Sequence, residues 1–256
     1  MTIRPISTAS SRNGSACRPA RSAPMPPRRT ASEREDRPRE KRFRPFSCCA
    51  KSSPWHHAKE EWRGMIFELR TYDLKPGKAP VYLEFFRTFG LSLVTRHLPM
   101  GGYWMAETGR LNRIEHLWIY EDFAERDACR ASLAKDRAWM EEFIPRAFAD
   151  VTGQANRFMA LERSSAALDA VIESRREAHA NEAASGPMFA STLNALSQSA
   201  DPLDGDSLLG AFRIVSGDEP GRHVTLRTGS FDNLTEDTGG LIAHALIRPL
   251  AFSPIA

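Results

Sequence analysis

The pattern of hydrophobic positions marks a pair of strands in the middle of the chain. Residues 103–108 and 113–121 are rich in aromatic and β-branched side chains and are separated by a short glycine-containing turn. This pattern predicts a β-hairpin. In its second strand, both the face that carries His116 and the face that carries Leu117 bear apolar bulk. Because successive side chains of a strand point to opposite faces, we expect both faces of the hairpin to be covered.

The segments on either side of this hairpin alternate between strand and helix patterns. Residues 65–74 predict a strand, residues 78–98 a helix with an apolar stripe, residues 123–148 a second helix, and residues 154–163 a last strand. The resulting order is strand, helix, strand, strand, helix, strand. This is the order of a ferredoxin-like βαββαβ module, an α+β fold with an antiparallel sheet and both helices on one face.

The other face of such a sheet needs a cover of its own. We place on it the aromatic-rich face of the hairpin, with His116, Trp118 and Tyr120. So much aromatic surface is not expected to stay in contact with water. Two sheets packed face to face would cover it, so we predict that two modules pair into a closed α/β barrel, within one chain or between two chains.

The first sixty-four residues differ in kind from this body. Residues 1–64 are rich in Arg, Pro and Ser and show no hydrophobic period, so they are not expected to fold. They could be an organelle transit peptide, which would place the protein in mitochondria, or a basic nucleic-acid tail. They could also be a segment that is not made. We favour the last, because Met65 directly precedes the first predicted strand.

Composition narrows the class of protein. Hydrophobic residues make up 41% of the chain and charged residues 26%, as in soluble globular proteins. The net charge of +3 comes mainly from the basic first segment, so nucleic acid is not an expected partner of the body. No apolar run is long enough for a membrane span. Only Cys129 lies in the body, which excludes a disulfide framework there and indicates a reducing, cytoplasmic compartment.

Short motifs follow one another through residues 65–163. They are Glu68-Leu69-Arg70-Thr71-Tyr72, Leu74-Lys75-Pro76-Gly77, Arg96-His97-Leu98, Gly102, Glu107, Gly109, Leu111-Asn112, His116-Leu117-Trp118, Tyr120 and Arg126. On these residues the segment resembles the NIPSNAP family of the dimeric α/β barrel superfamily. The resemblance implies the paired barrel but no defined activity. Eukaryotic relatives are associated with mitochondria and with vesicle or mitophagy roles, and the superfamily includes cofactor-free monooxygenases, isomerases and haem-handling enzymes.

A second hairpin pattern occurs at residues 208–231. At a constant separation along the chain, its residues Gly210, Phe212, Gly217 and Phe231 align with Gly102, Trp104, Gly109 and Phe123. Residues 168–184 predict a helix ahead of it, and the chain end resembles the closing strand of the family. We therefore predict a shortened, degenerate second module over residues 166–256, a tandem repeat that could close the barrel within one chain. An unrelated hairpin extension is the alternative.

His116 is the candidate catalytic residue. A histidine in the middle of a strand, on the face that we assign to the barrel interior, could act as a general base with Glu68 and Tyr72 as partners. The candidate ligand-binding residues are Arg70, Trp104, Glu107, Trp118 and Tyr120. The structural alternatives are a buried histidine satisfied by hydrogen bonds, an ion pair between Glu68 and Arg70, and aromatic residues that only pack the core.

Two functions follow from these residues. The first is a NIPSNAP-family protein of undefined activity that binds a small apolar ligand or a protein partner in its barrel, as a homodimer or an intrachain pseudo-dimer. The second is a cofactor-independent monooxygenase or isomerase that uses His116. The sequence has no glycine-rich phosphate loop, nucleophile elbow or paired-cysteine zinc motif, so we expect no cofactor and no metal. A purely structural interaction module would lack a cavity of about 300 Å3 or more.

Overall fold

The computed structural model describes residues 55–236 and 238–256, which belong to one compact unit, and the predictions for residues 1–54 lie outside this range. Strand β1 (Trp55–His57) and the 3-10 turn η1 (Glu60–Trp62) precede Met65. Strand β1 pairs with the end of β5 (Val151–Ser165), and the Trp62 side chain is buried. The body therefore begins before the predicted boundary, whereas the use of Met65 as the first residue stays a prediction.

The elements of the first half follow the predicted order, with each of the two helices divided into segments. They are β2 (Ile66–Leu74), α1 (Ala79–Phe85), η2 (Phe86–Gly90), α2 (Leu91–Thr95), β3 (Met100–Ala106), β4 (Arg113–Tyr120), α3 (Phe123–Leu133), η3 (Ala138–Phe143), α4 (Ile144–Ala147) and β5. The predicted turn between β3 and β4 requires left-handed backbone at Gly109 (φ 76°) and Asn112 (φ 56°). The Asn112 side chain also accepts a hydrogen bond from the backbone N–H of Gly77, at 2.8 Å.

The second half contains the predicted hairpin but less helix than expected. Its elements are α5 (Ala166–Ser174), β6 (Asn194–Ser199), β7 (Leu208–Ser216), β8 (His223–Thr228), α6 (Phe231–Thr235) and β9 (Leu241–Pro249). Helix α5 ends ten residues before the predicted end of this helix at residue 184. A loop, rather than a helix, joins β6 to β7, and α6 is a short helix of 5 residues. The outer face of the second half is therefore covered more thinly than that of the first.

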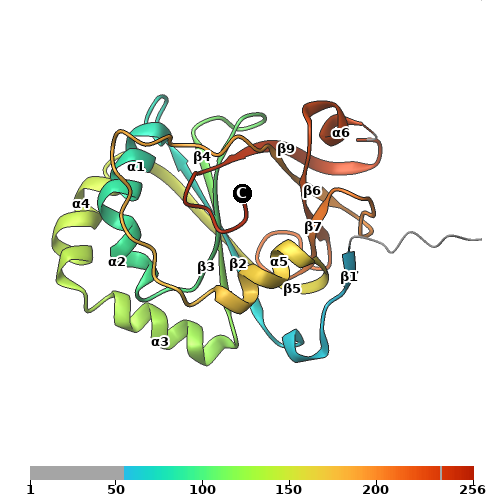
Figure 1. Cartoon of the computed structure of the whole chain (residues 1–256), viewed down its shortest axis with the longest axis horizontal. Coiled ribbons are helices and arrows are strands. Elements are labelled where there is room, and N and C mark those ends of the chain that lie inside the picture. Colours follow the sequence, from blue (N-terminus) through green and yellow to red (C-terminus); the bar gives the residue numbers. More distant parts are fainter. Residues whose placement is uncertain (1–54, 237) are drawn as a thin grey trace, which may run out of the picture. The chain divides into compact units, whose positions relative to one another are not determined.

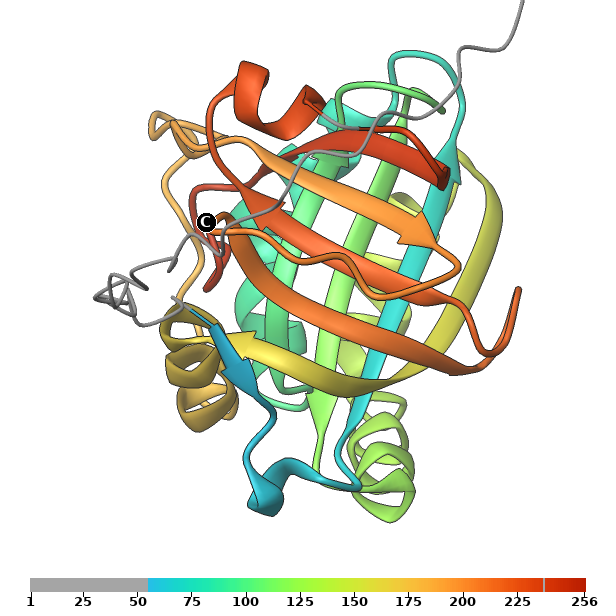
Figure 2. The same cartoon turned by 90° about the vertical axis from the view of Figure 1, so that its right-hand side faces the viewer.

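The strands close into one antiparallel barrel within a single chain (Figure 2). They are hydrogen-bonded in the order β1-β5-β2-β4-β3-β9-β6-β8-β7, and β5 also pairs with β7, so eight strands form the ring and β1 extends beside it. The first half contributes β5-β2-β4-β3 and the second half β9-β6-β8-β7. In each half the fourth, first, third and second strands follow one another in that order.

The two faces of the barrel wall bury different clusters of side chains. An inner cluster includes Phe67, Leu117 and Phe212, and an outer cluster lies between the strands of the first half and helices α1 to α4 (Figure 1). Our assignment of the face with His116, Trp118 and Tyr120 to the barrel interior was therefore wrong. Trp118 and Tyr120 belong to the outer cluster, and His116 contacts it. The apolar stripes of the helices pack against the face with Trp118 and Tyr120, and Leu117 and Ile119 face the interior.

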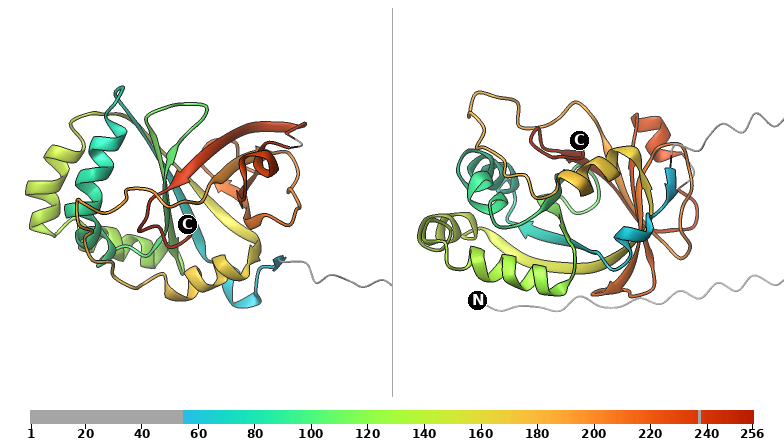
Figure 3. Two further views of the ribbon diagram at one scale, coloured as in Figure 1. Left: turned by 45° about the horizontal axis from the view of Figure 1, so that its top comes forward. Right: turned by 60° about the horizontal axis from the view of Figure 1, so that its bottom comes forward.

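The segment that joins α5 to β6 runs back over the helices of the first half (Figure 3). The side chain of Asn181 accepts a hydrogen bond from the backbone N–H of Ser92 (2.9 Å), and the backbone N–H of Glu182 donates to the carbonyl of Arg87 (2.9 Å). This segment therefore joins the second half to the helical layer of the first.

Over residues 55–236 and 238–256, no helix combines the length and the apolar character needed to cross a lipid bilayer.

Candidate functional site at the barrel mouth

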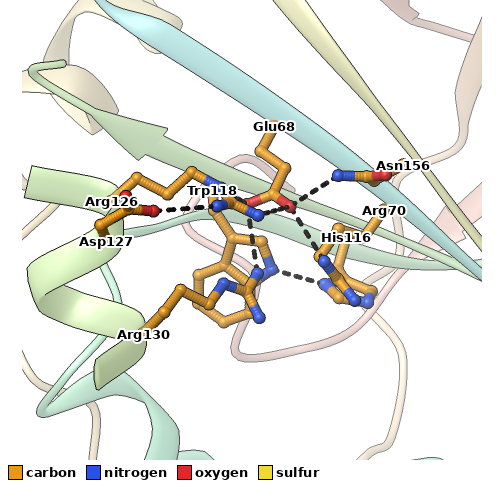
Figure 4. A network of polar contacts seen from close by, with 8 residues as sticks. All are labelled: Glu68, Arg70, His116, Trp118, Arg126, Asp127, Arg130 and Asn156. Carbon is orange, nitrogen blue, oxygen red and sulfur yellow. Dashed lines mark hydrogen bonds and ion pairs between the residues drawn. The ribbon is translucent and has the colours of Figure 1, made fainter. Parts of the chain in front are cut away.

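Glu68 lies on the outer face of β2, and its carboxylate is surrounded by arginine side chains (Figure 4). Its carboxylate accepts hydrogen bonds from Arg70 Nη1 (2.9 Å), from Arg126 Nε and Nη2 (both 3.1 Å), from Arg130 Nη2 (3.1 Å) and from Asn156 Nδ2 (3.0 Å). A carboxylate offers about four lone-pair directions, so these five donors saturate it. The Glu68 side chain is fully buried, with 0% of its surface exposed.

The charge state of Glu68 follows from these contacts. Burial alone would raise the pKa of the Glu68 carboxyl. The hydrogen bond from Arg126 and the charges of Arg130 and Arg70 outweigh burial and hold that pKa at about 2. A saturated carboxylate with this pKa is poorly suited to take a proton from a ligand near neutral pH. The geometry therefore favours the ion-pair interpretation of Glu68 and Arg70 over a catalytic one.

His116 is held in a box of aromatic rings on the same face. Trp118 Nε1 donates a hydrogen bond to His116 Nδ1 (2.6 Å), the imidazole stacks on Tyr103 (centroids 4.9 Å apart), and Tyr72 meets its edge at 4.7 Å. Burial, followed by the charges of Arg70 and Arg130, holds the pKa of His116 well below its ordinary value. The ring is therefore neutral, and its proton is on Nε2 because Nδ1 accepts the indole N–H.

The structure does not bring the predicted site residues together in one place. Glu68, Arg70, Tyr72, His116, Trp118 and Tyr120 lie under the helices of the first half. Trp104 instead faces the barrel interior, where its Nε1 donates to Asn194 Oδ1 at 3.0 Å. Glu107 lies at the seam between the two halves and forms an ion pair with Arg248 at 3.1 Å. Trp104 is thus the one predicted residue in the inner cluster.

A cavity of about 200 Å3 opens at the end of the barrel next to the β3–β4 turn. It is lined by Ala106, Thr108, Gly109, Arg110, Arg113, Glu115, Arg157, Leu196, Ser197, Gln198, Val224, Ala243, His244, Ala245 and Ile247. Deeper in the barrel, Trp104 and the surrounding apolar side chains leave only about 10 Å3, about the smallest volume that can hold one water molecule. At the opposite end, Trp62, Leu168 and Ile172 belong to the packed inner cluster. We call the open cavity the barrel mouth.

Glu115 is the buried carboxyl of the barrel mouth. It is 6% exposed, and Thr71 Oγ1 donates a hydrogen bond to its Oε2 at 2.6 Å. Burial raises the pKa of the Glu115 carboxyl to about 7, although the bond from Thr71 and the charges of Arg113 and Arg157 act in the opposite direction. Glu115 therefore populates both its neutral and its charged form near neutral pH.

The arginines of the barrel mouth differ in their partners. Arg113 donates to both carboxylate oxygens of Asp73 (2.8 and 3.1 Å), and Arg110 forms an ion pair with the same carboxylate (3.1 Å). Arg157 lines the cavity and is half-buried, yet its guanidinium forms no hydrogen bond or ion pair with any residue of the described ranges. Arg157 is therefore a cation at the cavity wall with its donors available.

Glu115 and Arg157 were both missed by the sequence analysis. Glu115 shares a strand face with Leu117 and Ile119, so a single carboxyl on an otherwise apolar face was a signal that could have been used. Arg157 gave no such signal, because barrel closure alone places it beside the cavity.

Among the residues that the structure describes, no group of three or more His, Cys, Asp or Glu side chains could hold a metal ion.

Comparison with known proteins identifies the first half of the chain. The model of the NIPSNAP family matches residues 67–166, a range that contains Glu68, His116, Glu115 and Arg157. In Mus musculus, Protein NipSnap homolog 3B is 44% identical over 93 residues, which are 36% of this chain and 37% of that protein. The match thus spans just over a third of the length of this relative.

Bacterial relatives of known structure match over nearly their whole length. A NIPSNAP family protein of unknown function from Agrobacterium tumefaciens is 31% identical, and the alignment covers 43% of this chain and 98% of that one, with a TM-score of 0.40. An uncharacterised NIPSNAP domain protein from Burkholderia xenovorans is 33% identical and is covered over 90% of its length, against 36% of this chain, with a TM-score of 0.35. At these identities over almost complete domains, the chain belongs to the NIPSNAP family.

Proposed function

We propose that this NIPSNAP-family protein binds a small molecule at the barrel mouth. The observation that carries the proposal is the cavity of about 200 Å3 in which the buried carboxyl of Glu115 lies beside the unpaired guanidinium of Arg157. Apolar walls with a few polar groups at one end are typical of ligand sites. The cavity is smaller than the about 300 Å3 that we expected of a ligand-binding barrel, and a purely structural interaction module would also have so small a cavity, so the proposal is restricted to a ligand smaller than drug-sized ones.

We further infer that each half of the barrel is a ferredoxin-like module and that residues 166–256 are a shortened, diverged second copy. The shared strand order supports this inference. In both halves a glycine also leaves room for an aromatic ring two residues later. A Cβ on Gly102 would lie 2.1 Å from the ring of Trp104, and one on Gly210 would lie 2.9 Å from the ring of Phe212. The barrel mouth then lies where equivalent ends of the two copies meet.

The rival function, a cofactor-independent monooxygenase or isomerase that uses His116, has weaker support. His116 is 3% exposed, its Nδ1 already accepts a hydrogen bond, and it does not line the barrel mouth. General base catalysis requires the base to come within hydrogen-bonding distance of the proton that it removes. The carboxyl of Glu115 meets this requirement for a ligand in the barrel mouth, and the imidazole of His116 does not.

Small six-carbon probes test whether the barrel mouth binds ligands at all. Hexanoate, hexanamide and adipate have similar lengths and differ in their charged ends. We expect at least one of them to raise the thermal unfolding midpoint with a saturable concentration dependence. The variant Ala245→Phe places a large side chain in the cavity lining and should abolish this effect.

The matched control is Ala178→Phe, which adds the same side chain at an exposed position outside the cavity lining. This control should bind the probes as the unmodified protein does. If none of the three probes binds, or if Ala245→Phe folds and binds them unchanged, the proposed function is wrong.

A further inference from the structure

The pairing registers relate the two halves of the barrel position by position. In the first half, Leu69 of β2 pairs with Leu117 on one side and Arg157 on the other. In the second half, Leu196 of β6 pairs with Leu226 and Ala245. Both central leucines line the same inner pocket. The position equivalent to the cation of Arg157 is therefore occupied by the methyl side chain of Ala245.

The same comparison applies to the buried carboxyl. Thr71 of β2 pairs with Glu115, and Glu115 pairs in turn with Trp104 of β3. The corresponding pairs in the second half join Gln198 to Val224 and Val224 to Phe212. Val224 thus stands at the position equivalent to Glu115. The second half carries an apolar side chain at each of the two positions where the first half carries a charge-bearing one.

At these two pairs of equivalent positions the barrel mouth consequently carries charge-bearing side chains from the first half and apolar ones from the second, although Ser197, Gln198 and His244 of the second half also line it. A barrel made of two identical halves would present two carboxyls and two arginines around its axis. Here Glu115 and Arg157 face a wall that includes Leu196, Val224 and Ala245. The polar Gln198 at this rim donates to the side chain of Glu219. Glu115 and the guanidinium of Arg157 therefore lie together on the first-half side of the cavity.

We propose that the barrel mouth is built for a small monocarboxylate with a hydrocarbon body. Its carboxylate would bind Arg157, and its body would lie against Leu196, Val224 and Ala245. This inference rests on the proposed function and specifies its ligand class. A planar guanidinium donates two parallel hydrogen bonds to a carboxylate, so a single unpaired arginine suffices as the anchor. A second charged group on the ligand would meet the apolar wall without a partner.

Glu115 adds a pH dependence to this arrangement. The groups around it are Thr71, which donates to it, the cations Arg113 and Arg157, and the carboxylate of Asp73. Below the pKa of about 7 that burial gives Glu115, its neutral carboxyl can donate a hydrogen bond to a bound carboxylate. Above that pKa, two negative charges would repel each other. Hexanoate affinity should therefore fall as pH rises above 7, and Glu115→Gln should remove this dependence.

Calorimetric titration with the three six-carbon probes tests the ligand class. We expect hexanoate to bind most tightly, because hexanamide lacks the charge and adipate carries a second one. The variant Arg157→Gln should weaken hexanoate binding roughly tenfold or more and leave hexanamide binding nearly unchanged, since one charge-assisted hydrogen-bonded pair is lost. The control Arg137→Gln removes an exposed arginine (85%) that directly precedes η3 and should change neither affinity.

A second variant reverses the asymmetry of the site. Ala245→Arg puts a guanidinium at the position equivalent to Arg157 and should shift the preference from hexanoate to adipate. If adipate already binds the unmodified protein more tightly than hexanoate, or if Arg157→Gln weakens hexanamide and hexanoate equally, the one-ended site is wrong while ligand binding stands. Both of these outcomes can be measured even if Ala245→Arg does not fold. Absence of all probe binding would instead contradict the proposed function itself.

Discussion

Two buried glutamates on neighbouring strands of this barrel have opposite charge behaviour. Glu68 lies on the outer face of β2 and has a pKa of about 2. Glu115 lies on the inner face of β4 and has a pKa of about 7. Both are almost inaccessible to solvent, at 0% and 6% exposed. Burial penalises the charged form of each, so burial alone cannot explain the difference.

The difference comes from the number of donors that each environment supplies. The helical layer brings Arg126 and Arg130 of α3 over the carboxylate of Glu68, and Arg70 reaches it from its own strand. The barrel interior supplies Glu115 with one hydroxyl, that of Thr71, as a hydrogen-bond donor. The first carboxyl is thus fixed in a structural ion cluster, whereas the second keeps a proton that can be exchanged. A reactive carboxyl is therefore better sought where burial is incompletely compensated.

The largest expected effect comes from removing the negative charge of Glu68 on the outer face of the barrel. Glu68→Gln leaves three arginines around a neutral amide, so we expect the free energy of unfolding to fall by about 3–5 kcal/mol, as for other broken buried ion pairs. Urea unfolding at pH 7 measures this change. Glu142→Gln, at an exposed position, is the control and should stay within about 0.5 kcal/mol.

Urea unfolding at acid pH tests the same prediction further. The folded-state pKa of Glu68 lies below its ordinary value of 4.5. The stabilisation by Glu68 is therefore complete above pH 4.5 and is lost as pH falls toward 2. Glu68→Gln should lack this loss. A variant as stable as the unmodified protein at pH 7 would show that the cluster is solvated and that the comparison between the two glutamates does not hold.

The second prediction concerns Glu115, whose contribution to the free energy of unfolding changes with pH in the direction opposite to that of Glu68. The folded state holds the proton of Glu115 up to about pH 7, whereas the unfolded chain releases it near pH 4.5. The free energy of unfolding should therefore fall as pH rises from 4.5 to 7, by up to about 1.4 kcal/mol per pH unit. Glu115→Gln cannot titrate, so its stability relative to the unmodified protein should rise by about 2–3 kcal/mol between pH 5 and pH 8.

Urea unfolding at several pH values between 5 and 8 checks this prediction. The cations Arg113 and Arg157 and the carboxylate of Asp73 surround Glu115 in both proteins, so the difference between the two curves isolates its proton. Parallel curves for Glu115→Gln and the unmodified protein would mean that the pKa of Glu115 is not raised.

The smallest expected effect concerns the hydrogen bond between the uncharged side chains of His116 and Trp118 on the outer face of the barrel. His116→Phe removes the acceptor of the Trp118 indole N–H, and we expect a loss of about 1–3 kcal/mol in the free energy of unfolding. Trp118→Phe provides the second edge of a double-mutant cycle. The double variant should lose less than the sum of the two single losses, because it leaves neither polar atom without its partner.

The same variants also distinguish a role of His116 in stability from a role in ligand binding at the barrel mouth. His116→Phe should leave hexanoate affinity unchanged, because His116 does not line the cavity. A coupling energy near zero would mean that the hydrogen bond contributes nothing to stability. A loss of hexanoate binding without a loss of stability would restore His116 as a site residue.

Signals between residues close together in the amino-acid sequence specify the local features of this protein. Stretches rich in aromatic and β-branched residues located the hairpin of β3 and β4, and apolar stripes located the helices that flank it. Gly109 and Asn112 marked a turn that needs left-handed backbone, which follows from the steric limits of each residue alone. The short motifs of residues 65–163 identified the family before any coordinates were known. All of these signals lie within a few residues of one another along the chain.

Contacts between segments far apart in the chain set which face is the inside, how the barrel closes and which polar groups line the barrel mouth. Alternation shows that His116 and Trp118 share one face and that Glu115 and Leu117 share the other, but it does not show which face the helices cover. Closure depends on pairing between β5 and β7, which are far apart in sequence. Only that closure places Arg157 and Val224 around one cavity, because charge states and cavities are properties of the assembled neighbours.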